Sequence, residues 1–207
     1  MAKKRRMNLP NILTTCRMVA VIVLVVIALI SWDGVLVSNF ELEWLRITIC
    51  GLFIVASVTD FLDGYIARKR NIVTTFGKFM DPIADKLLVN LTFVILTAWG
   101  VVPVLVTILI IARDLIVDAI RMVMVQHNVV IAASIWGKLK TICQMVCIPT
   151  VLLSLSVDSL LNTGSFFWDA GQVLCYLCAV ISLFSGVDYF WKNRKTVLEG
   201  ALEEYDQ

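Results

Sequence analysis

The sequence predicts an all-α polytopic membrane protein with six transmembrane helices, and both its composition and its hydrophobic pattern indicate this class. Of the 207 residues, 59% are apolar and 16% are charged, with a mean hydropathy of +0.88. Soluble domains have about 45–50% apolar and about 25% charged residues. Six stretches are long and apolar enough to span a bilayer, which takes roughly 20 residues: 12–32, 44–67, 76–98, 102–126, 135–157 and 168–191. No polar linker divides them, so we expect one membrane domain over residues 1–207.

Lysine and arginine alternate between the two ends of these stretches, which predicts their orientation. They occur in the N-terminal segment, in or beside the second–third and fourth–fifth connections, and in the tail, whereas the other three connections have none. Cytoplasmic loops are enriched in these residues. We therefore expect a cell-membrane protein with a cytoplasmic N-terminal segment (1–11) and a cytoplasmic tail (192–207). No small-residue cleavage site follows the first stretch, which we expect to be a retained helix and not a signal peptide.

The sequence contains six cysteines, whose positions argue against a disulfide framework. All of them lie inside apolar stretches: Cys16, Cys50, Cys143, Cys147, Cys175 and Cys178. Cys175 and Cys178 form a CxxC pair with neither a partner pair nor histidines. We interpret the cysteines as small apolar residues of packed helices.

Four aspartates lie inside apolar stretches, where a charge is costly. Asp60 and Asp63 are near the end of the second stretch, and Asp81 and Asp85 are near the start of the third. A charge at the centre of a membrane helix costs about 2.5–3.5 kcal/mol on insertion scales. Spacings of three and four residues place each pair on one helix face, and the short basic turn makes the two helices antiparallel neighbours. We therefore expect both pairs to converge on one polar cavity on the cytoplasmic side.

These carboxylates favour a hard divalent cation, Mg²⁺, Mn²⁺ or Ca²⁺, and no cluster of histidine and cysteine suggests zinc. Two such ions can stabilise the attacking and leaving oxygens of a phosphate reaction. Gly64 and Ala67 lie on or beside the aspartate face and permit a substrate to approach the backbone, and Arg68 is suited to hold phosphate. In the alternative interpretation, the acids pair with Arg68, Lys78 and Lys86 only to stabilise helix packing. That alternative does not explain the interleaved glycine and alanine.

The eight residues of this region resemble the signature of the CDP-alcohol phosphotransferase family. The matching pattern is Asp60-x2-Asp63-Gly64-x2-Ala67-Arg68-x8-Gly77-x3-Asp81-x3-Asp85. The resemblance implies a six-helix membrane enzyme, usually a homodimer. Such an enzyme uses a divalent metal, Mg²⁺ or Mn²⁺ and here two ions, and a hydroxyl acceptor to displace CMP from a CDP-linked lipid or alcohol.

The resemblance also implies roles for the individual residues of the pattern. All four carboxylates would be metal ligands: Asp60, Asp63, Asp81 and Asp85. Asp85 would also be the general base that takes the proton of the acceptor hydroxyl. The remaining residues would line the pocket for the cytidine diphosphate of the lipid: Gly64, Ala67, Arg68 and Gly77.

Within the family, the sequence is most similar to bacterial phosphatidylglycerophosphate synthases, from Asn8 to about Gln144. The similar runs are 8–17, 59–68, 76–88 and 137–144. Asp114, which follows Arg113, is a departure, because those enzymes more often carry glutamate there. The implied reaction transfers the phosphatidyl group from CDP-diacylglycerol to sn-glycerol 3-phosphate, giving phosphatidylglycerol phosphate and CMP.

Three cations on the expected cytoplasmic side are candidates for binding the acceptor phosphate: Arg113, Arg121 and Lys138. Alternatively, Arg121 pairs with Asp118 or Asp114 on its own helix, and Lys138 extends towards lipid headgroups. The identity of the acceptor therefore rests on the resemblance, and inositol phosphate, serine or a phospholipid remain alternatives.

A cation-coupled transporter is an alternative from another functional class. Transporters tend to place intramembrane acids near the midplane, on broken helices of repeated halves. Here the acids are off-centre, the helices look continuous and the two halves differ, so we favour an enzyme. We expect the lipid bilayer and the two substrates as partners, and no nucleic acid.

Overall fold

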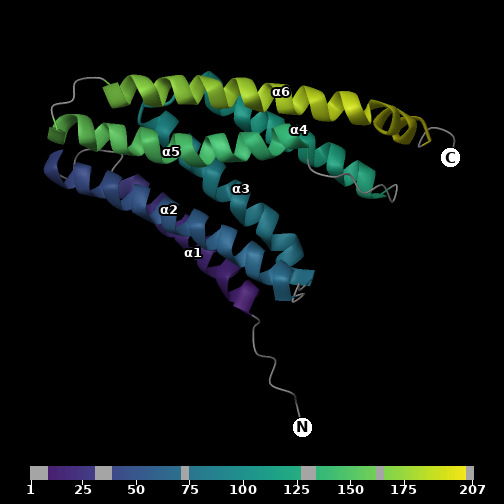
Figure 1. Cartoon of the computed structure of the whole chain (residues 1–207), viewed down its shortest axis with the longest axis horizontal. Helices are drawn as coiled ribbons and strands as arrows, with labels where there is room; N and C mark the ends of the chain where they lie inside the picture. The colour runs from purple at the N-terminus through teal and green to yellow at the C-terminus, as the bar shows by residue number, and fades with distance from the viewer. Residues whose placement is uncertain (1–8, 31–38, 71–74, 127–133, 162–165, 204–207) are drawn as a thin grey trace, which may run out of the picture.

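The computed structural model is all-α in the part of the chain that it describes (Figure 1). It describes the backbone of residues 9–30, 39–70, 75–126, 134–161 and 166–203, and the side chains of 15–30, 44–59, 83–124, 134–155 and 166–194. The helices are α1 (Leu9–Ile30), α2 (Asn39–Arg70), α3 (Thr75–Ala98), α4 (Val104–Gln126), α5 (Ile135–Leu161) and α6 (Phe166–Glu203). The predicted all-α class is confirmed, and each apolar stretch corresponds to one helix.

Helix α6 continues well beyond the apolar stretch that predicts it. Its 38 residues run to Glu203, so much of the predicted tail is helical. Two contacts support the helix just after Trp191: Lys192 Nζ lies 2.8 Å from a carboxylate oxygen of Asp188, and Asn193 Nδ2 donates to the Tyr189 carbonyl at 2.7 Å. Such i,i+4 pairs stabilise a helix outside an apolar environment.

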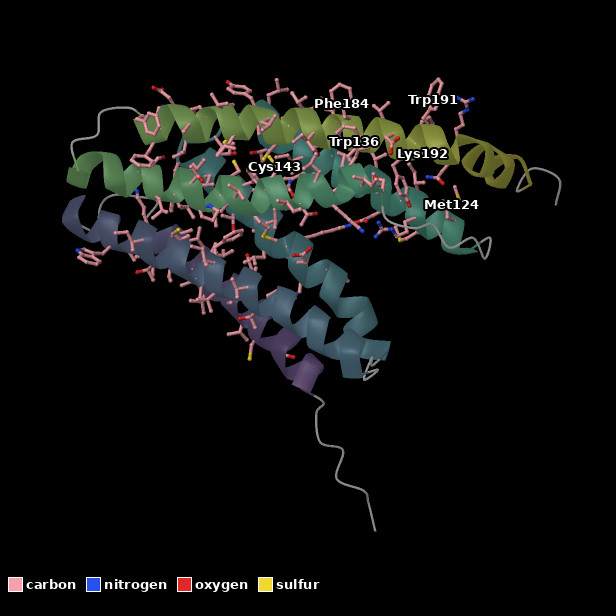
Figure 2. All side chains as sticks on the ribbon, in the orientation of Figure 1. Met124, Trp136, Cys143, Phe184, Trp191 and Lys192 are labelled. Carbon is pink, nitrogen blue, oxygen red and sulfur yellow. The ribbon has the colours of Figure 1, made fainter. Side chains whose placement is uncertain are left out.

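Two helices contain segments that are long and apolar enough to cross a membrane: Ile135–Leu155 of α5 and Phe166–Arg194 of α6. Shorter apolar segments, Thr15–Ile30 and Trp44–Thr59, lie in α1 and α2. The search covers only the described residues, so six crossings and their orientation stay predictions. Large apolar side chains also cover outward faces. Figure 2 shows Phe184 and Trp191 projecting from α6, where they are 64% and 65% exposed.

The helices pack as two groups that share α5. Helices α5 and α6 run antiparallel side by side, and α4 packs against α6 (Figure 1). Helix α1 packs against α2 and α3, and α2 also packs against α5. Helix α3 contacts α2, α4 and α5. The start of α3, with its aspartates, therefore belongs to a helix that contacts four others, α1, α2, α4 and α5.

The turn between α3 and α4 sets these two helices side by side. Gly100 has a φ of +72°, a left-handed conformation that glycine adopts without strain. Its N–H donates to the Thr97 carbonyl and the Val101 N–H donates to the Leu96 carbonyl, both at 2.9 Å. These two bonds form a Schellman motif, which ends α3. Pro103 precedes α4, and its carbonyl accepts the Val106 N–H at 3.0 Å.

The main apolar core lies where these helices meet, and it includes a cluster of sulfur atoms between α5 and α6. The Sγ atoms of Cys143 and Cys178 are 2.9 Å apart, and those of Cys147 and Cys175 are 3.5 Å apart. These four side chains are buried, and all six cysteines are free thiols. The predicted absence of a disulfide framework is confirmed. Cys16 is the exception to the packing interpretation, because it is exposed.

Candidate active site

The aspartate pattern lies on two helices that contact each other. Asp60 and Asp63 belong to α2, and Asp81 and Asp85 belong to α3. Asp85 is the one residue of the pattern whose side chain the structure describes. The other seven side chains lie outside the described residues: Asp60, Asp63, Gly64, Ala67, Arg68, Gly77 and Asp81. Among the described side chains, no group of three or more acids, cysteines or histidines is arranged to hold a metal ion. Convergence of the two aspartate pairs therefore stays a prediction.

A polar pocket of about 280 Å³ lies beside Asp85. Side chains of α3, α4, α5 and α6 line it, and eight of them carry a charge: Asp85, Lys86, Arg113, Asp114, Asp118, Arg121, Lys138 and Lys140. The three cations predicted for the acceptor phosphate are in this list. The structure thus brings Arg113, Arg121 and Lys138 into one pocket with the predicted base.

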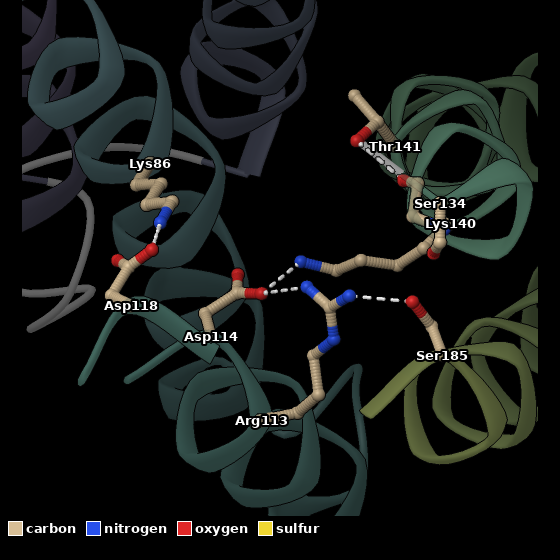
Figure 3. A network of polar contacts seen from close by, with 9 residues as sticks. Lys86, Arg113, Asp114, Asp118, Ser134, Lys140, Thr141 and Ser185 are labelled. Carbon is tan, nitrogen blue, oxygen red and sulfur yellow. Dashed lines mark hydrogen bonds and ion pairs between the residues drawn. The ribbon is translucent and has the colours of Figure 1, made fainter. Parts of the chain in front are cut away.

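A buried network around Asp114 crosses the pocket (Figure 3). Asp114 Oδ1 accepts a hydrogen bond from Arg113 Nη1 at 3.0 Å and another from Lys140 Nζ. Arg113 Nη2 donates to Ser185 Oγ of α6. The side chains of Arg113, Asp114 and Lys140 are only 12%, 5% and 6% exposed. A buried charge requires a partner, so Asp114 compensates two cations and links α4 to α5.

This network changes the interpretation of Arg113, which the sequence suggested as a ligand of the acceptor phosphate. Both terminal nitrogens of Arg113 are committed within the protein, so Arg113 is better suited to shape the pocket than to hold a ligand. Lys140 is likewise held by Asp114.

Of the other three cations of the pocket, Arg121 and Lys138 remain available to a ligand and Lys86 does not. Asp118 pairs with Lys86 of α3 (Figure 3), and Asp114 is engaged as described, so neither acid pairs with Arg121. Arg121 and Lys138 are exposed, and neither forms an ion pair with another residue that the structure describes. The pairing of Lys86 with Asp118 also weakens the alternative in which Lys86 pairs with the aspartates of the pattern.

Helix α6 contributes residues that the sequence interpretation did not identify. Ser185 holds Arg113, and Tyr189 lines the pocket with its buried hydroxyl unpartnered among the described residues. Gly186 permits the close approach of the helix, because a Cβ there would lie 3.0 Å from Arg113 Cγ. Tyr189 follows Ser185 by four residues and Gly186 by three, so these small and polar residues lie on one side of an apolar helix. That spacing was the available signal.

An apolar groove of about 460 Å³ meets the polar pocket at Asp85 and Thr141, which line both. Its other walls are side chains of α2 and α5: Phe53, Ile54, Ser57, Val58, Ile142, Met145, Val146 and Pro149. Ile54, Val58, Ile142 and Val146 are each more than 40% exposed, so the groove opens outwards between the two helices. A carboxylate therefore separates a polar pocket from an apolar groove.

Comparison with known proteins shows which family the chain belongs to. The family model of the CDP-alcohol phosphatidyltransferases matches residues 7–184. The CDP-diacylglycerol–glycerol-3-phosphate 3-phosphatidyltransferase of Bacillus subtilis (strain 168) is 34% identical, over 90% of this chain and 95% of its own. The protein of the same name from Mycoplasma genitalium is 39% identical, over 88% of this chain and 82% of its own. A cardiolipin synthase (CMP-forming) of Oryza sativa subsp. japonica is 34% identical, over 93% of this chain and 59% of its own. The chain therefore belongs to the CDP-alcohol phosphatidyltransferase family.

Proposed function

We propose that the protein transfers the phosphatidyl group of CDP-diacylglycerol to sn-glycerol 3-phosphate, giving phosphatidylglycerol phosphate and CMP. The observation that carries this proposal is the position of Asp85, where a cation-lined polar pocket meets an apolar groove. The reaction needs such a junction, because a small phosphorylated alcohol must reach the phosphorus atom of a lipid. Seven relatives that bear the name of this reaction are 33–39% identical to the chain.

The donor atoms of the pattern fit a divalent cation. Four carboxylates on two contacting helices supply the hard oxygen ligands that Mg²⁺ and Mn²⁺ prefer. Asp60, Asp63, Asp81 and Asp85 would hold the metal, and we propose two ions. When bound, the metal neutralises the diphosphate and the charge that develops as CMP leaves.

The protein's own residues perform the remaining steps. Asp85 accepts the proton of the acceptor hydroxyl as its oxygen attacks the phosphorus that carries diacylglycerol. The bond from that phosphorus to the CMP oxygen breaks, and CMP leaves. Arg121 and Lys138 hold the acceptor phosphate, and Arg113 shapes the same pocket. The cytidine diphosphate is bound by the remaining residues of the pattern: Gly64, Ala67, Arg68 and Gly77. The apolar groove takes an acyl chain of the donor.

We further propose that all six helices cross the cell membrane as one domain, with both termini and the polar cavity on the cytoplasmic side, and that the protein is a homodimer. The distribution of lysine and arginine supports this orientation. The exposed apolar side chains of α1, α4 and α6 support a lipid environment, because water-soluble monomers rarely expose so much apolar surface.

A phospholipid acceptor is the second candidate, because a CMP-forming cardiolipin synthase is among the relatives. The polar pocket argues for a smaller acceptor, since it measures only about 280 Å³ and charged side chains line it.

The test is CMP release by the purified full-length protein in vesicles with CDP-diacylglycerol, Mg²⁺ or Mn²⁺, and a panel of acceptors. We expect release only with metal, and fastest with sn-glycerol 3-phosphate, with a product of the mass of phosphatidylglycerol phosphate. No release with any acceptor would overturn the transferase function. Release with inositol phosphate or phosphatidylglycerol alone would retain the chemistry and overturn the acceptor.

A further inference from the structure

Gln144 lies in the wall of the polar pocket, one helical turn beyond Lys140 on α5. Its side chain is only 2% exposed, and its Nε2 atom has no hydrogen-bond partner among the described residues. Buried amides normally have their hydrogen bonds satisfied, so an unpaired one requires an explanation. Lys140 offers a contrast, because the same pocket supplies its partner, Asp114. The described residues by themselves give no reason for an amide at position 144.

The described residues leave two kinds of pocket groups unpaired: exposed cations, and buried neutral groups, which are the Gln144 amide and the Tyr189 hydroxyl. Arg121 and Lys138 are exposed cations, suited to a phosphate. Gln144 is a buried neutral group, and its amide donates through nitrogen and accepts through oxygen. A hydroxyl also donates and accepts, so it complements an amide in both directions. The pocket therefore matches a molecule with a phosphate and at least one hydroxyl.

Glycerol 3-phosphate has two hydroxyls, and the pocket treats them differently. The reacting hydroxyl must meet Asp85, because an amide does not accept a proton at neutral pH. The hydroxyl on the middle carbon does not react, and it needs a neutral partner. We propose that Gln144 is a specificity-determining residue that hydrogen-bonds this middle hydroxyl. The inference rests on the proposed function and extends it to how the acceptor is recognised.

The test compares two acceptors that differ by this one group. sn-Glycerol 3-phosphate carries the middle hydroxyl, and 3-hydroxypropyl phosphate lacks only that hydroxyl. CMP release by the full-length protein in vesicles with CDP-diacylglycerol and Mg²⁺ is measured with each acceptor. The readout is the kcat/KM for glycerol 3-phosphate divided by the kcat/KM for 3-hydroxypropyl phosphate. We expect the wild type to prefer glycerol 3-phosphate at least about 10-fold, because a site built to bind a hydroxyl rejects the analogue without it.

Gln144→Met keeps the shape of the side chain and removes both hydrogen-bonding atoms. We expect it to lower kcat/KM for glycerol 3-phosphate about 10-fold, to leave 3-hydroxypropyl phosphate unchanged, and so to bring the ratio near one. Gln144→Leu is a second apolar variant in case the first does not fold. Cys147→Ala, three residues away on the α6 side of α5, is the matched control and should retain the wild-type ratio.

Four outcomes would overturn the proposal. A wild-type ratio near one means that the middle hydroxyl is not recognised. An unchanged ratio in the folded Gln144 variants excludes this residue as its partner. Loss of the ratio in Tyr189→Phe, with the Gln144 variants unaffected, assigns the hydroxyl to the tyrosine. If the wild type releases no CMP with either acceptor, the proposed function fails together with this inference. In the other outcomes the wild type still releases CMP, so only the inference fails.

Discussion

Helix α5 has two faces that meet opposite requirements. Towards α6 it packs Cys143 and Cys147 into a buried cluster of sulfur atoms with Cys175 and Cys178. Towards α3 and α4 it places Lys140, Thr141 and Gln144 in the polar pocket. Cys143 and Gln144 are adjacent in sequence, so the change from one environment to the other occurs within a single residue. Rotation of about 100° per residue along a helix is sufficient to separate them.

The difference between the two faces of α5 indicates how unpaired polar groups can be interpreted. Apolar residues in the α5–α6 interface need only close packing, and their burial explains them. Each charged or polar group in the pocket needs a partner, and the groups without a described one are then candidates for ligand contacts. In this pocket those groups are Arg121, Lys138, the Gln144 amide nitrogen, the Tyr189 hydroxyl and the Nε atom of Arg113, whose two terminal nitrogens are bonded. Function is therefore expected in the polar pocket, which only one of the two faces of α5 lines.

Asp85→Asn should have the largest effect, because it removes the proposed base where the two pockets meet. We expect CMP release to fall about 10²- to 10⁴-fold, the usual contribution of general base catalysis. Helical content and migration on size exclusion should match the wild type. Turnover within a few-fold of the wild-type rate would remove Asp85 from the mechanism.

Asp114→Asn should be the most destabilising change in the pocket. It leaves the buried Arg113 and Lys140 without their acid, and breaking one partner of a buried pair costs about 3–5 kcal/mol. Denaturant unfolding in detergent measures this loss. Asp114→Glu is the matched control, since it keeps the charge, and it should retain most of the stability. Equal stability of the Asp114→Asn variant and the wild type would show that the network is not a structural requirement.

Arg121→Ala should instead affect binding and leave stability nearly unchanged, because Arg121 pairs with no described acid. We expect KM for glycerol 3-phosphate to rise about 10- to 100-fold, the value of a hydrogen bond to a charged group, with kcat little altered. Lys192→Ala removes an exposed cation whose partner is Asp188 and should leave KM unchanged. A similar rise in both variants would indicate a general charge effect and no phosphate site at Arg121.

The sequence was sufficient for the helices, because each apolar stretch is long and bounded by polar residues. It was less informative about helix ends. The apolar stretch ends at Trp191, yet α6 continues to Glu203, since leaving an apolar environment does not by itself end a helix.

The partners within the site were harder to predict than its members. Spacing suggested Asp118 or Asp114 for Arg121, but Asp118 pairs with Lys86 of α3 and Asp114 pairs with Lys140, 26 residues away. Which acid meets which cation depends on how each helix is rotated about its axis. Hydrophobic pattern constrains that rotation only to within a broad face. Ser185 and Tyr189 were missed for the same reason, as polar residues in an apolar helix do not reveal which neighbour they face.

Cys147→Ala should have the smallest effect and is the sharpest test of the contrast between the two faces. It removes one sulfur atom from the buried α5–α6 interface, and we expect a loss of stability of about 1 kcal/mol, as for other small deletions in a core. Cys147→Ser should cost little more, because a hydroxyl in a helix can donate to the carbonyl four residues earlier, as Thr150 does to Val146 at 2.8 Å. Kinetic constants for the acceptor should stay within two-fold of wild type in both variants, as roughly 0.4 kcal/mol separates a two-fold change from none. A larger change would mean that the sulfur cluster and the pocket are coupled through α5, and the two faces would then have to be treated as one site.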